Sequence, residues 1–310
     1  MNASLPFDQL RMHFAGHLQE NVVMANYTTA HVGGPVDALL PVNSLEELAH
    51  AAEILWKLEA PFMVVGSGSN VLVSDHGLHT MVLLNRSRNV KIDTRSAVPT
   101  VWAESGANFG HMSRQVALRG LSGLEWAATI PGTVGGAVYG NAGAYGSDIH
   151  SSLILAEILH RDQGRETWLV DRLEYSYRSS LLKREHLPVV VLAARFRANP
   201  AAPADVQKKI EDFSKKRQST QPPGASMGSM FKNPEGDYAG RLIEAAGLKG
   251  QRVGGAEISP VHANFFINND KATAQDIWEL IRLARQSVFK KFGIQLELEI
   301  ELLGEFEKGE

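Results

Sequence analysis

The sequence predicts an α+β fold that is rich in strands, on three observations. Two segments, 44–60 and 272–293, carry apolar residues at helical spacing, and Gly293 is placed to end the second helix. Between them, short apolar runs are separated by Gly, Ser and Asn, which is the spacing of strands and turns. The last stretch, 294–303, alternates apolar and charged residues, which predicts a final strand with one buried face.

In the first part of the chain, local signals mark where elements begin and end. Ser44 and Glu47 form a capping-box pair ahead of an apolar stripe, so a helix is expected to begin there. Gly120 is placed to end a later helix. The elements expected here are a helix over 44–60, strands over 61–85, a helix over 106–120 and strands over 153–197.

A Pro-rich passage indicates a domain junction near residues 200 to 205. Pro-rich sequence stands on both sides of a charged amphipathic helix expected over 204–219. We therefore expect one larger region over 1–202, made of two α+β subdomains divided near residue 100. A smaller α+β domain is expected over 203–310, with the final strand at its end.

Composition and charge exclude several classes of function. The 310 residues carry a formal net charge of -3 without a local basic patch, so no nucleic-acid partner is expected. The chain holds no cysteine, and no histidine pair has metal-ligand spacing within a carboxylate cluster, so disulfides, thiolate catalysis and a metal site are not expected. It also lacks an apolar run of about 18 residues and a signal peptide. We therefore expect a cytoplasmic protein without membrane insertion.

The first candidate binding loop lies in "VVGSGSNVLV", residues 64–73. It is no Rossmann fingerprint, because Val71 holds the third glycine position and strand-like sequence follows, and no P-loop pattern occurs either. In a turn between two strands, successive backbone N–H groups can surround a phosphate or pyrophosphate. From this loop alone, that role and a ligand-free glycine hairpin are equally favoured. The candidate residues are Gly66, Ser67, Gly68, Ser69 and Asn70.

A second glycine loop, "IPGTVGGAVYGNAGAYG", covers residues 130–146. Glycine removes the Cβ that keeps other groups away from the backbone, so the chain either folds tightly on itself here or lies against a ligand. Two such loops favour a flat ring system that carries a diphosphate. The candidate cofactor-binding residues of this loop are Ile130, Pro131, Gly132, Thr133, Gly135, Gly136, Asn141 and Gly143.

Seven stretches in a fixed order, from about residue 26 to 304, resemble the UDP-N-acetylenolpyruvoylglucosamine reductase family: "VVGSGSNVLVSD", "GLSGLEWAATIPGTVGGAVYGNAGAYG", "YSYRSS", "GSMFKNP", "YAGRLIEAAGLKG", "HANFFIN" and "GIQLELEIELLG". The resemblance implies an FAD-binding module of the vanillyl-alcohol oxidase and p-cresol methylhydroxylase type, followed by a smaller substrate domain. It implies NADPH as reductant and noncovalent FAD, since the first loop has Ser67 and the chain has no cysteine. The implied reaction reduces UDP-N-acetylglucosamine enolpyruvate to UDP-N-acetylmuramate in peptidoglycan precursor synthesis.

By motif, the resemblance implies three catalytic residues. Arg178 in "YSYRSS" is the permanent cation that stabilises negative charge on the substrate, although a lone arginine in this setting is usually a surface residue. Ser229 in "GSMFKNP" is the acid that protonates the α-carbon, although a turn or cap serine is the simpler explanation without the family. Glu299 is the catalytic carboxylate, which alternation alone does not distinguish from Glu297 and Glu301 on the same face.

The resemblance also implies residues that bind the UDP-sugar, and the chain departs from the family's pattern in two places. Leu298 stands where the family commonly has proline, and the 221–228 linker is short. The span from the arginine motif to the serine motif resembles the compact variety of the family. The expected substrate-binding residues are Tyr177, Arg217, Lys232 and Asn233.

Two other functions stay open at this point. One is another FAD-dependent sugar or alcohol oxidoreductase built on the same module, which would share the glycine loops but not need the serine and glutamate motifs. The other is a nucleotide-sugar-binding regulator without catalysis. A monomer or a weak oligomer is expected in each case.

Overall fold

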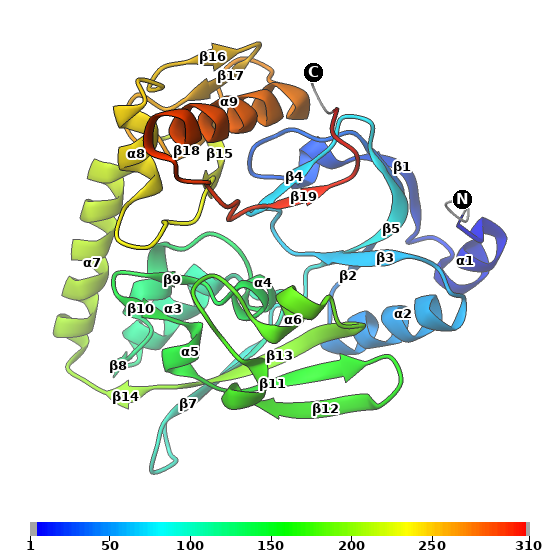
Figure 1. Cartoon of the computed structure of the whole chain (residues 1–310). Coiled ribbons are helices and arrows are strands. Elements are labelled where there is room, and N and C mark those ends of the chain that lie inside the picture. The colour runs from blue at the N-terminus through cyan, green and yellow to red at the C-terminus, as the bar shows by residue number, and fades with distance from the viewer. Residues whose placement is uncertain (1–4, 308–310) are drawn as a thin grey trace.

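The computed structural model describes residues 5–307, which form three sheets of four or five strands with helices packed on them (Figure 1). The elements of the first sheet and its helices are α1 (Phe7–Phe14), β1 (Gln19–Val23), β2 (Pro35–Val42), α2 (Leu45–Lys57), β3 (Phe62–Val65) and β5 (Leu78–Asn85). The strand order is β1-β2-β5-β3, with β1 antiparallel to β2 and the other neighbours parallel.

Helix α2 begins where the sequence predicts. The Ser44 hydroxyl accepts a hydrogen bond from the Glu47 N–H at 3.1 Å, while the Glu47 carboxylate accepts from the Asn43 N–H at 2.7 Å. Its apolar side packs in one cluster with Met81 of β5 and Leu159 of a strand in the second sheet. The helix therefore joins the first sheet to the second.

The second sheet is antiparallel throughout, with strand order β12-β11-β13-β7-β6. Its strands are β6 (Val90–Asp93), β7 (Thr100–Glu104), β11 (Leu153–His160), β12 (Gly164–Leu169) and β13 (Val189–Arg197). The helices of this part are α3 (Phe109–Leu118), α4 (Val134–Gly140), α5 (Ile149–Ser152) and α6 (Leu181–Glu185). The remaining short elements are η1 (Met24–Tyr27), β8 (Leu121–Ser122), η2 (Glu125–Thr129), β9 (Gly143–Ala144), β10 (Ser147–Asp148), η3 (Val170–Leu173) and β14 (Asn199–Pro200).

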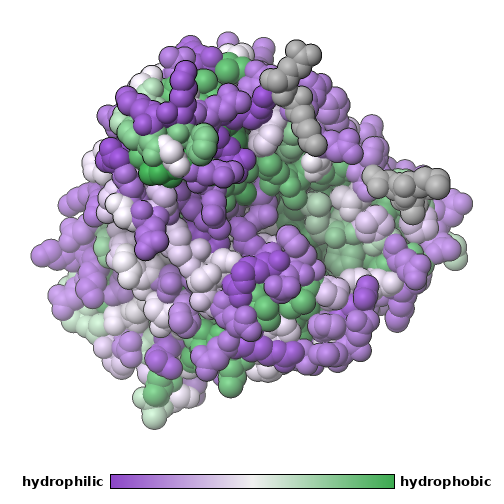
Figure 2. Space-filling model, in the orientation of Figure 1, coloured by the Kyte–Doolittle hydropathy of each residue, from purple (hydrophilic) through white to green (hydrophobic). Residues whose placement is uncertain are grey.

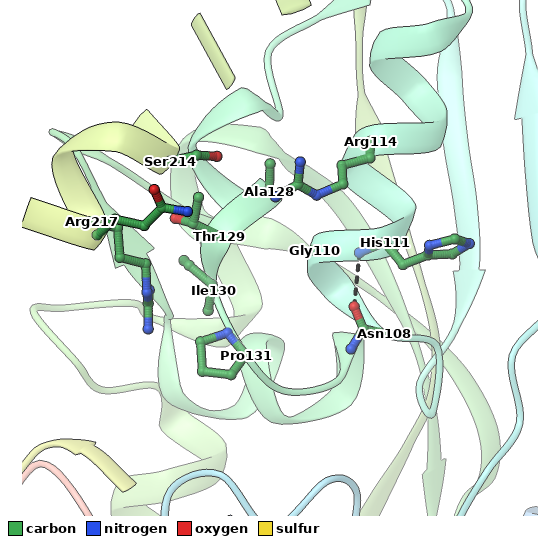
Figure 3. A pocket seen from close by; sticks show the side chains of 11 residues that line it. Asn108, Gly110, His111, Arg114, Ala128, Thr129, Ile130, Pro131, Ser214 and Arg217 are labelled. Carbon is green, nitrogen blue, oxygen red and sulfur yellow. Dashed lines mark hydrogen bonds between the residues drawn. The ribbon is translucent and has the colours of Figure 1, made fainter. Parts of the chain in front are cut away.

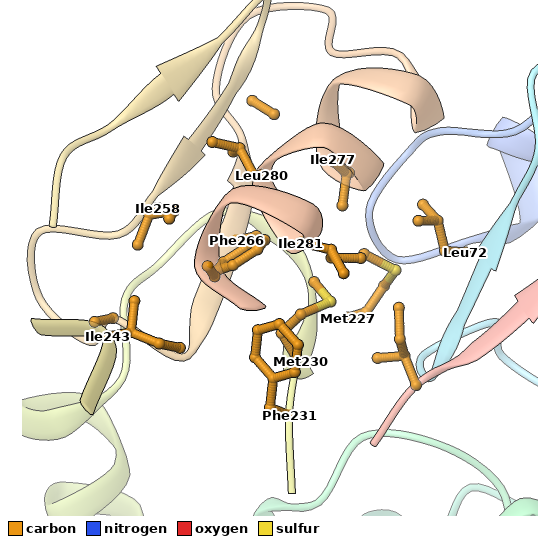
Figure 4. Close-up of a cluster of buried hydrophobic side chains, with 14 of the residues drawn as sticks. Leu72, Met227, Met230, Phe231, Ile243, Ile258, Phe266, Ile277, Leu280 and Ile281 are labelled. Carbon is orange, nitrogen blue, oxygen red and sulfur yellow. The ribbon is translucent and has the colours of Figure 1, made fainter. Parts of the chain in front are cut away.

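The third sheet is also antiparallel, in the order β15-β18-β17-β16. Its elements are β15 (Ala225–Ser229), α8 (Ala239–Ala245), β16 (Arg252–Val253), β17 (Ala256–Ile258), β18 (Phe265–Asn268) and α9 (Ala274–Phe292). Figure 4 shows the buried cluster under α9, where Met227 and Met230 meet Phe266 and Ile281, with Leu72 of the first half beside them. Helix α9 ends at Gly293 in the left-handed conformation, as predicted.

Helix α7 (Pro203–Thr220) packs on the second sheet's helices. Its buried residues Val206 and Ile210 form a cluster with Ala117 of α3 and Ala128 of η2. The chain leaves the first sheet after Asn85 and enters the second at Val90. The domain limits of 1–202 and 203–310, with a division near residue 100, stay predictions.

The final strand predicted over 294–303 is wrong for most of its length. Only β19 (Glu301–Leu303) is a strand, and it pairs in parallel with β4 (Val71–Val73). Before it, the segment has a different partner, since a single antiparallel bridge joins Phe231 to Leu298. The alternating pattern is real, but the chain changes partner in the middle, so no continuous ladder forms.

The helices and strands together confirm the α+β class. The other elements expected from the sequence over 44–60, 61–85, 106–120, 153–197 and 204–219 are present, with ends displaced by a few residues. Within residues 5–307, no helix is both long enough and apolar enough to span a membrane.

Candidate active site

The two glycine loops lie against each other. A Cβ built on Gly66 would lie 2.4 Å from the Thr133 Oγ1, and a Cβ on Gly132 would lie 3.0 Å from the Ser69 Oγ. Gly68, at φ +61°, would bring a Cβ to 2.1 Å from the Tyr27 carbonyl oxygen. These glycines are therefore needed first for close packing of the protein on itself.

The first loop nevertheless leaves a row of backbone donors free. None of the N–H groups of residues 67–70 donates a hydrogen bond to an acceptor among the described residues. Asn70 is held by other atoms, since its Nδ2 donates to the Glu299 carbonyl at 3.1 Å and its carbonyl accepts from the Glu301 N–H at 2.9 Å. A run of unpaired N–H groups in a turn is a concave site for an anion.

Arg178 lies on a tight turn that the second loop holds in place. The turn is closed by two hydrogen bonds of 3.1 Å between the backbones of Ser176 and Ser179, and Arg178 itself has φ +54°. Asn141 is buried, and its Nδ2 donates to the Ser176 carbonyl at 2.9 Å. A Cβ on Gly143 would lie 2.7 Å from the Ser147 carbonyl oxygen and 3.2 Å from the Arg178 Nη1, so this glycine allows close packing against both. Asn141 and Gly143 thus pack against the protein's own chain, and their role toward a cofactor stays a prediction.

The structure brings Arg178 and Glu299 together. The Arg178 Nε lies 2.7 Å from the Glu299 Oε1. The Glu299 side chain is 19% exposed, whereas that of Glu297 is 74% exposed. Burial raises the pKa of Glu299, although the positive charges of Arg178, Lys183 and Lys232 act to lower it. Tertiary contacts therefore separate three glutamates that the alternating pattern leaves equivalent.

Ser229 is the last residue of β15, and the next residue is hydrogen-bonded to the segment that carries Glu299. The Glu299 N–H donates to the Met230 carbonyl at 2.9 Å, which places the serine one residue from that bond. The Ser229 hydroxyl has no hydrogen-bond partner among the described residues. The structure therefore brings Arg178 to Glu299 and places the backbone next to Ser229 against the Glu299 segment, although the three residues come from different parts of the chain.

Asn264 fixes the segment that carries Ser229. Its side-chain oxygen accepts from the Phe231 N–H at 2.9 Å, and its Nδ2 donates to the Phe231 carbonyl at 2.8 Å. Its own carbonyl accepts from the Met230 N–H at 2.8 Å. The sequence analysis did not single out this residue, although it lies in the quoted "HANFFIN" stretch. A buried asparagine inside an apolar run is the signal that could have found it.

Neither departure from the family's pattern disturbs this arrangement. The pairing around Leu298 uses the carbonyl of Glu297, which accepts from the Lys232 N–H at 2.9 Å, and the N–H of Glu299. Since the backbone N–H of Leu298 itself takes no part, a leucine serves here as well as a proline. The short 221–228 linker docks on the first half through the Thr29 hydroxyl, which donates to the Ser226 carbonyl at 2.7 Å.

The predicted substrate-binding residues are spread around the site. Tyr177 is 54% exposed, and its ring centroid lies 5.5 Å from the guanidinium carbon of Arg178. The Lys232 Nζ lies 3.5 Å from a Glu297 carboxylate oxygen. The Asn233 side-chain oxygen accepts from the first N–H of α8 at 3.1 Å, which leaves its NH₂ group for other partners. Their roles toward a ligand stay predictions.

Arg217 lines a pocket of about 530 Å³ between α3, η2 and α7. Figure 3 shows its side chain extending from α7 beside Ile130 and Pro131. Burial lowers its pKa, and it forms no ion pair with a described residue. Arg114 adds a second cation to the pocket, which favours an anionic or polar occupant. The pocket joins two of the predicted cofactor residues to one predicted substrate residue.

Comparisons with known proteins identify the family of this chain. Residues 218–303 match the family model "UDP-N-acetylenolpyruvoylglucosamine reductase, C-terminal domain", and residues 36–168 match "FAD binding domain". A UDP-N-acetylenolpyruvoylglucosamine reductase of Chloroflexus aggregans is 42% identical, covering 92% of this chain and 97% of that protein. One of Rubrobacter xylanophilus is 44% identical, covering 91% of this chain and 94% of that protein. The chain belongs to the UDP-N-acetylenolpyruvoylglucosamine reductase family.

A solved structure of the family has the same fold. The reductase of Thermus caldophilus is 35% identical to this chain, with a TM-score of 0.78, and the match covers 91% of this chain and 98% of that one. The resemblance seen in the seven sequence motifs is thereby confirmed.

The residues present fit the FAD of a UDP-N-acetylenolpyruvoylglucosamine reductase. The unpaired N–H groups of residues 67–70 suit a pyrophosphate. Figure 2 shows a hollow in the face of the molecule, between the part that carries α9 and the part below it, with hydrophobic residues on its walls. In the described part of the chain, no group of three or more His, Asp or Glu side chains could hold a metal ion.

Lys183 and Glu301 also lie at this site. The sequence analysis did not single out Lys183, and it did not distinguish Glu301 from the other two glutamates. Lys183 of α6 forms an ion pair with Glu301 at 2.5 Å, close to the pair of Arg178 and Glu299. Lys183 follows Arg178 by only five positions, and that nearness is the signal the sequence offered.

Proposed function

We propose that this protein reduces UDP-N-acetylglucosamine enolpyruvate to UDP-N-acetylmuramate with NADPH, through bound FAD, in peptidoglycan precursor synthesis. The observation that carries the proposal is the contact of Arg178 with Glu299 beside Ser229, at the point where the first glycine loop meets the C-terminal segment. When bound, FAD supplies the hydride that it receives from NADPH. Residues 66–70 would hold its pyrophosphate through their backbone donors.

In this proposal, Arg178 binds the carboxylate of the enolpyruvyl group. Its Nε lies 2.7 Å from the Glu299 Oε1, and the two terminal NH₂ groups are the ones proposed to bind the substrate. Hydride addition at the β-carbon leaves negative charge that spreads into this carboxylate. A permanent cation held by a rigid turn stabilises that charge more in the transition state than in the substrate.

We propose that Ser229 and Glu299 act in the protonation of the substrate. In this proposal, the Ser229 hydroxyl, which has no hydrogen-bond partner among the described residues, donates a proton to the α-carbon of the substrate. Because burial raises the pKa of Glu299, this carboxyl can hold a proton nearer to neutral pH than an exposed glutamate can, and hydrogen-bond to the developing enol. Tyr177, Arg217, Lys232 and Asn233 are proposed to bind the UDP-sugar.

The test follows the flavin colour through the two half-reactions. The protein is reduced anaerobically with NADPH, and UDP-N-acetylglucosamine enolpyruvate is then added. Bleaching by NADPH and recovery of colour with the sugar nucleotide is the expected result. If only oxygen restores the colour, the enzyme is an oxidase of the same module. If the protein takes up no FAD, the proposal fails altogether.

Ser229→Ala gives the matching variant test. We expect FAD binding and bleaching by NADPH to persist, while recovery of colour with the sugar nucleotide is lost. Ser226→Ala, on the same strand, is the control and should behave as the unchanged protein. Unchanged turnover in Ser229→Ala would sink the role given to this serine. The cytoplasmic location and the monomeric or weakly associating state stay predictions.

A further inference from the structure

A second ion pair runs beside the pair of Arg178 and Glu299. The Lys183 Nζ lies 2.5 Å from the Glu301 Oε1, and the Lys183 side chain is only 16% exposed. A lysine this well covered needs a partner, because burying an unpaired ammonium is costly. The pair is therefore better shielded from water than an ion pair on an open surface.

Both pairs join the same two pieces of the protein. Lys183 stands in α6, whose first turn is capped by Ser180, and Ser180 also donates its hydroxyl to the Tyr139 carbonyl at 2.6 Å. The turn that carries Arg178 leads directly into this helix. On the other side, Glu301 follows Glu299 by two residues and begins β19.

The segment with the two glutamates is also held by hydrogen bonds to the Ser229 segment and to the first loop. The Glu299 N–H donates to the Met230 carbonyl, and the Glu301 N–H donates to the Asn70 carbonyl of the first loop, both at 2.9 Å. The Asn70 Nδ2 donates to the Glu299 carbonyl at 3.1 Å. None of these bonds joins the segment to the arginine turn. Among the described residues, the side-chain links between this segment and the arginine turn with α6 are the ion pairs of Arg178 with Glu299 and of Lys183 with Glu301.

We propose that Lys183 and Glu301 are positioning residues for the reduction of the sugar nucleotide, holding Glu299 against Arg178 and balancing the charge around it. The inference rests on the proposed function. The charged and titratable groups involved are Arg178, Lys183 and Lys232 around Glu299, and Lys183 with Tyr139 around Glu301. Burial and the charge of Glu301 raise the pKa of Tyr139 to about 12, so this phenol stays neutral.

Removing one partner at a time should move the Glu299 titration in opposite directions. Lys183→Met removes a cation that stabilises the Glu299 carboxylate, so its pKa rises further. Glu301→Gln leaves Lys183 without its counter-charge, so the same cation acts more strongly on Glu299 and the pKa falls. A purely structural role would not produce opposite shifts.

The experiment measures each half-reaction by stopped flow between pH 5 and 9 for the FAD-loaded protein and the variants Lys183→Met, Lys183→Arg and Glu301→Gln. Lys249→Met, which breaks an ion pair of 2.9 Å with Glu244 away from the site, is the matched control. We expect Lys183→Met to slow reoxidation by the sugar nucleotide by about tenfold or more, since small misplacements are costly. The pH at which the reoxidation rate changes should rise in Lys183→Met and fall in Glu301→Gln. Lys183→Arg, which keeps the positive charge, should retain most of the rate.

Bleaching by NADPH should stay within about twofold in all variants, because neither residue is proposed to act in that step. Equal slowing of both half-reactions, loss of FAD, or a pH dependence that coincides with that of the unchanged protein would overturn the inference. Failure of the unchanged protein to be reoxidised by the sugar nucleotide would instead refute the proposed function.

Discussion

Replacing Asn264 by alanine removes one side chain that secures the Ser229 segment. The Asn264 side chain accepts a hydrogen bond from the Phe231 N–H at 2.9 Å and donates one to the Phe231 carbonyl at 2.8 Å. Asn264 is 3% exposed and Phe231 is 1% exposed. Water therefore has little access to the two backbone groups that the substitution would leave without partners.

The magnitude follows from those two groups. Leaving one buried donor or acceptor unpaired costs about 1–3 kcal/mol, so the loss of both partners should cost about 2–6 kcal/mol of the free energy of unfolding. The total stability of a protein domain is about 5–15 kcal/mol, so this is a large fraction of it. The freed segment also carries Ser229 and the Met230 carbonyl that binds Glu299, so reoxidation by the sugar nucleotide should slow as well.

The assay is urea unfolding of the FAD-loaded protein, followed by fluorescence and flavin absorbance, with Asn269→Ala as the matched control. Asn269 lies on the same stretch but is exposed, and its Nδ2 donates to the Glu257 carboxylate at 2.6 Å. We expect this control to cost less than about 1 kcal/mol, as surface substitutions do. If Asn264→Ala loses no more stability than Asn269→Ala, the buried hydrogen bonds do not hold the segment and the reasoning is refuted.

Three further predictions follow from single contacts. Gly68→Ala would place a Cβ 2.1 Å from the Tyr27 carbonyl oxygen, so the variant should lose its FAD, as measured by flavin absorbance. The control Gly236→Ala, which has open space around the new Cβ at φ +75°, should retain FAD. Burial lowers the pKa of His262 below its ordinary value of 6.5. The folded protein thus binds this proton more weakly than the unfolded chain does, and stability should fall as the pH drops below about 6.5. His262→Gln should flatten this dependence in denaturant titrations, and an unchanged slope would contradict it. Arg178→Lys keeps the charge but loses the planar fork, so reoxidation by the sugar nucleotide should slow by about 10²-fold or more with NADPH bleaching unchanged; equal slowing of both steps would count against its role.

Much of the fold was predictable because its signals are local. The start of α2 depends on Ser44 and Glu47, three positions apart, and the end of α9 depends on Gly293 alone. Both ends stand where the sequence analysis expected them. Helix caps and the periodic burial of one face act within a few residues, so a single sequence contains the information.

The sequence predicted where the glycine loops lie, but not what their glycines contact. The two loops together favoured a ligand against bare backbone, yet Gly66 and Gly68 face the protein's own Thr133 and Tyr27. What the loop offers a ligand is its unpaired N–H groups. Whether a glycine makes room for a ligand or for another loop depends on residues distant in the sequence, and composition does not contain that information.

By itself, the sequence determined the α+β class, the family through its ordered motifs, and the types of residue at the site. Only the tertiary structure decided which carboxylate joins that site. Glu297, Glu299 and Glu301 alternate identically along the chain, but the first is exposed, the second meets Arg178 and the third meets Lys183. The physical reason is that this segment leaves the third sheet and joins β4 within a few residues, so its contacts come from parts of the chain far away in sequence.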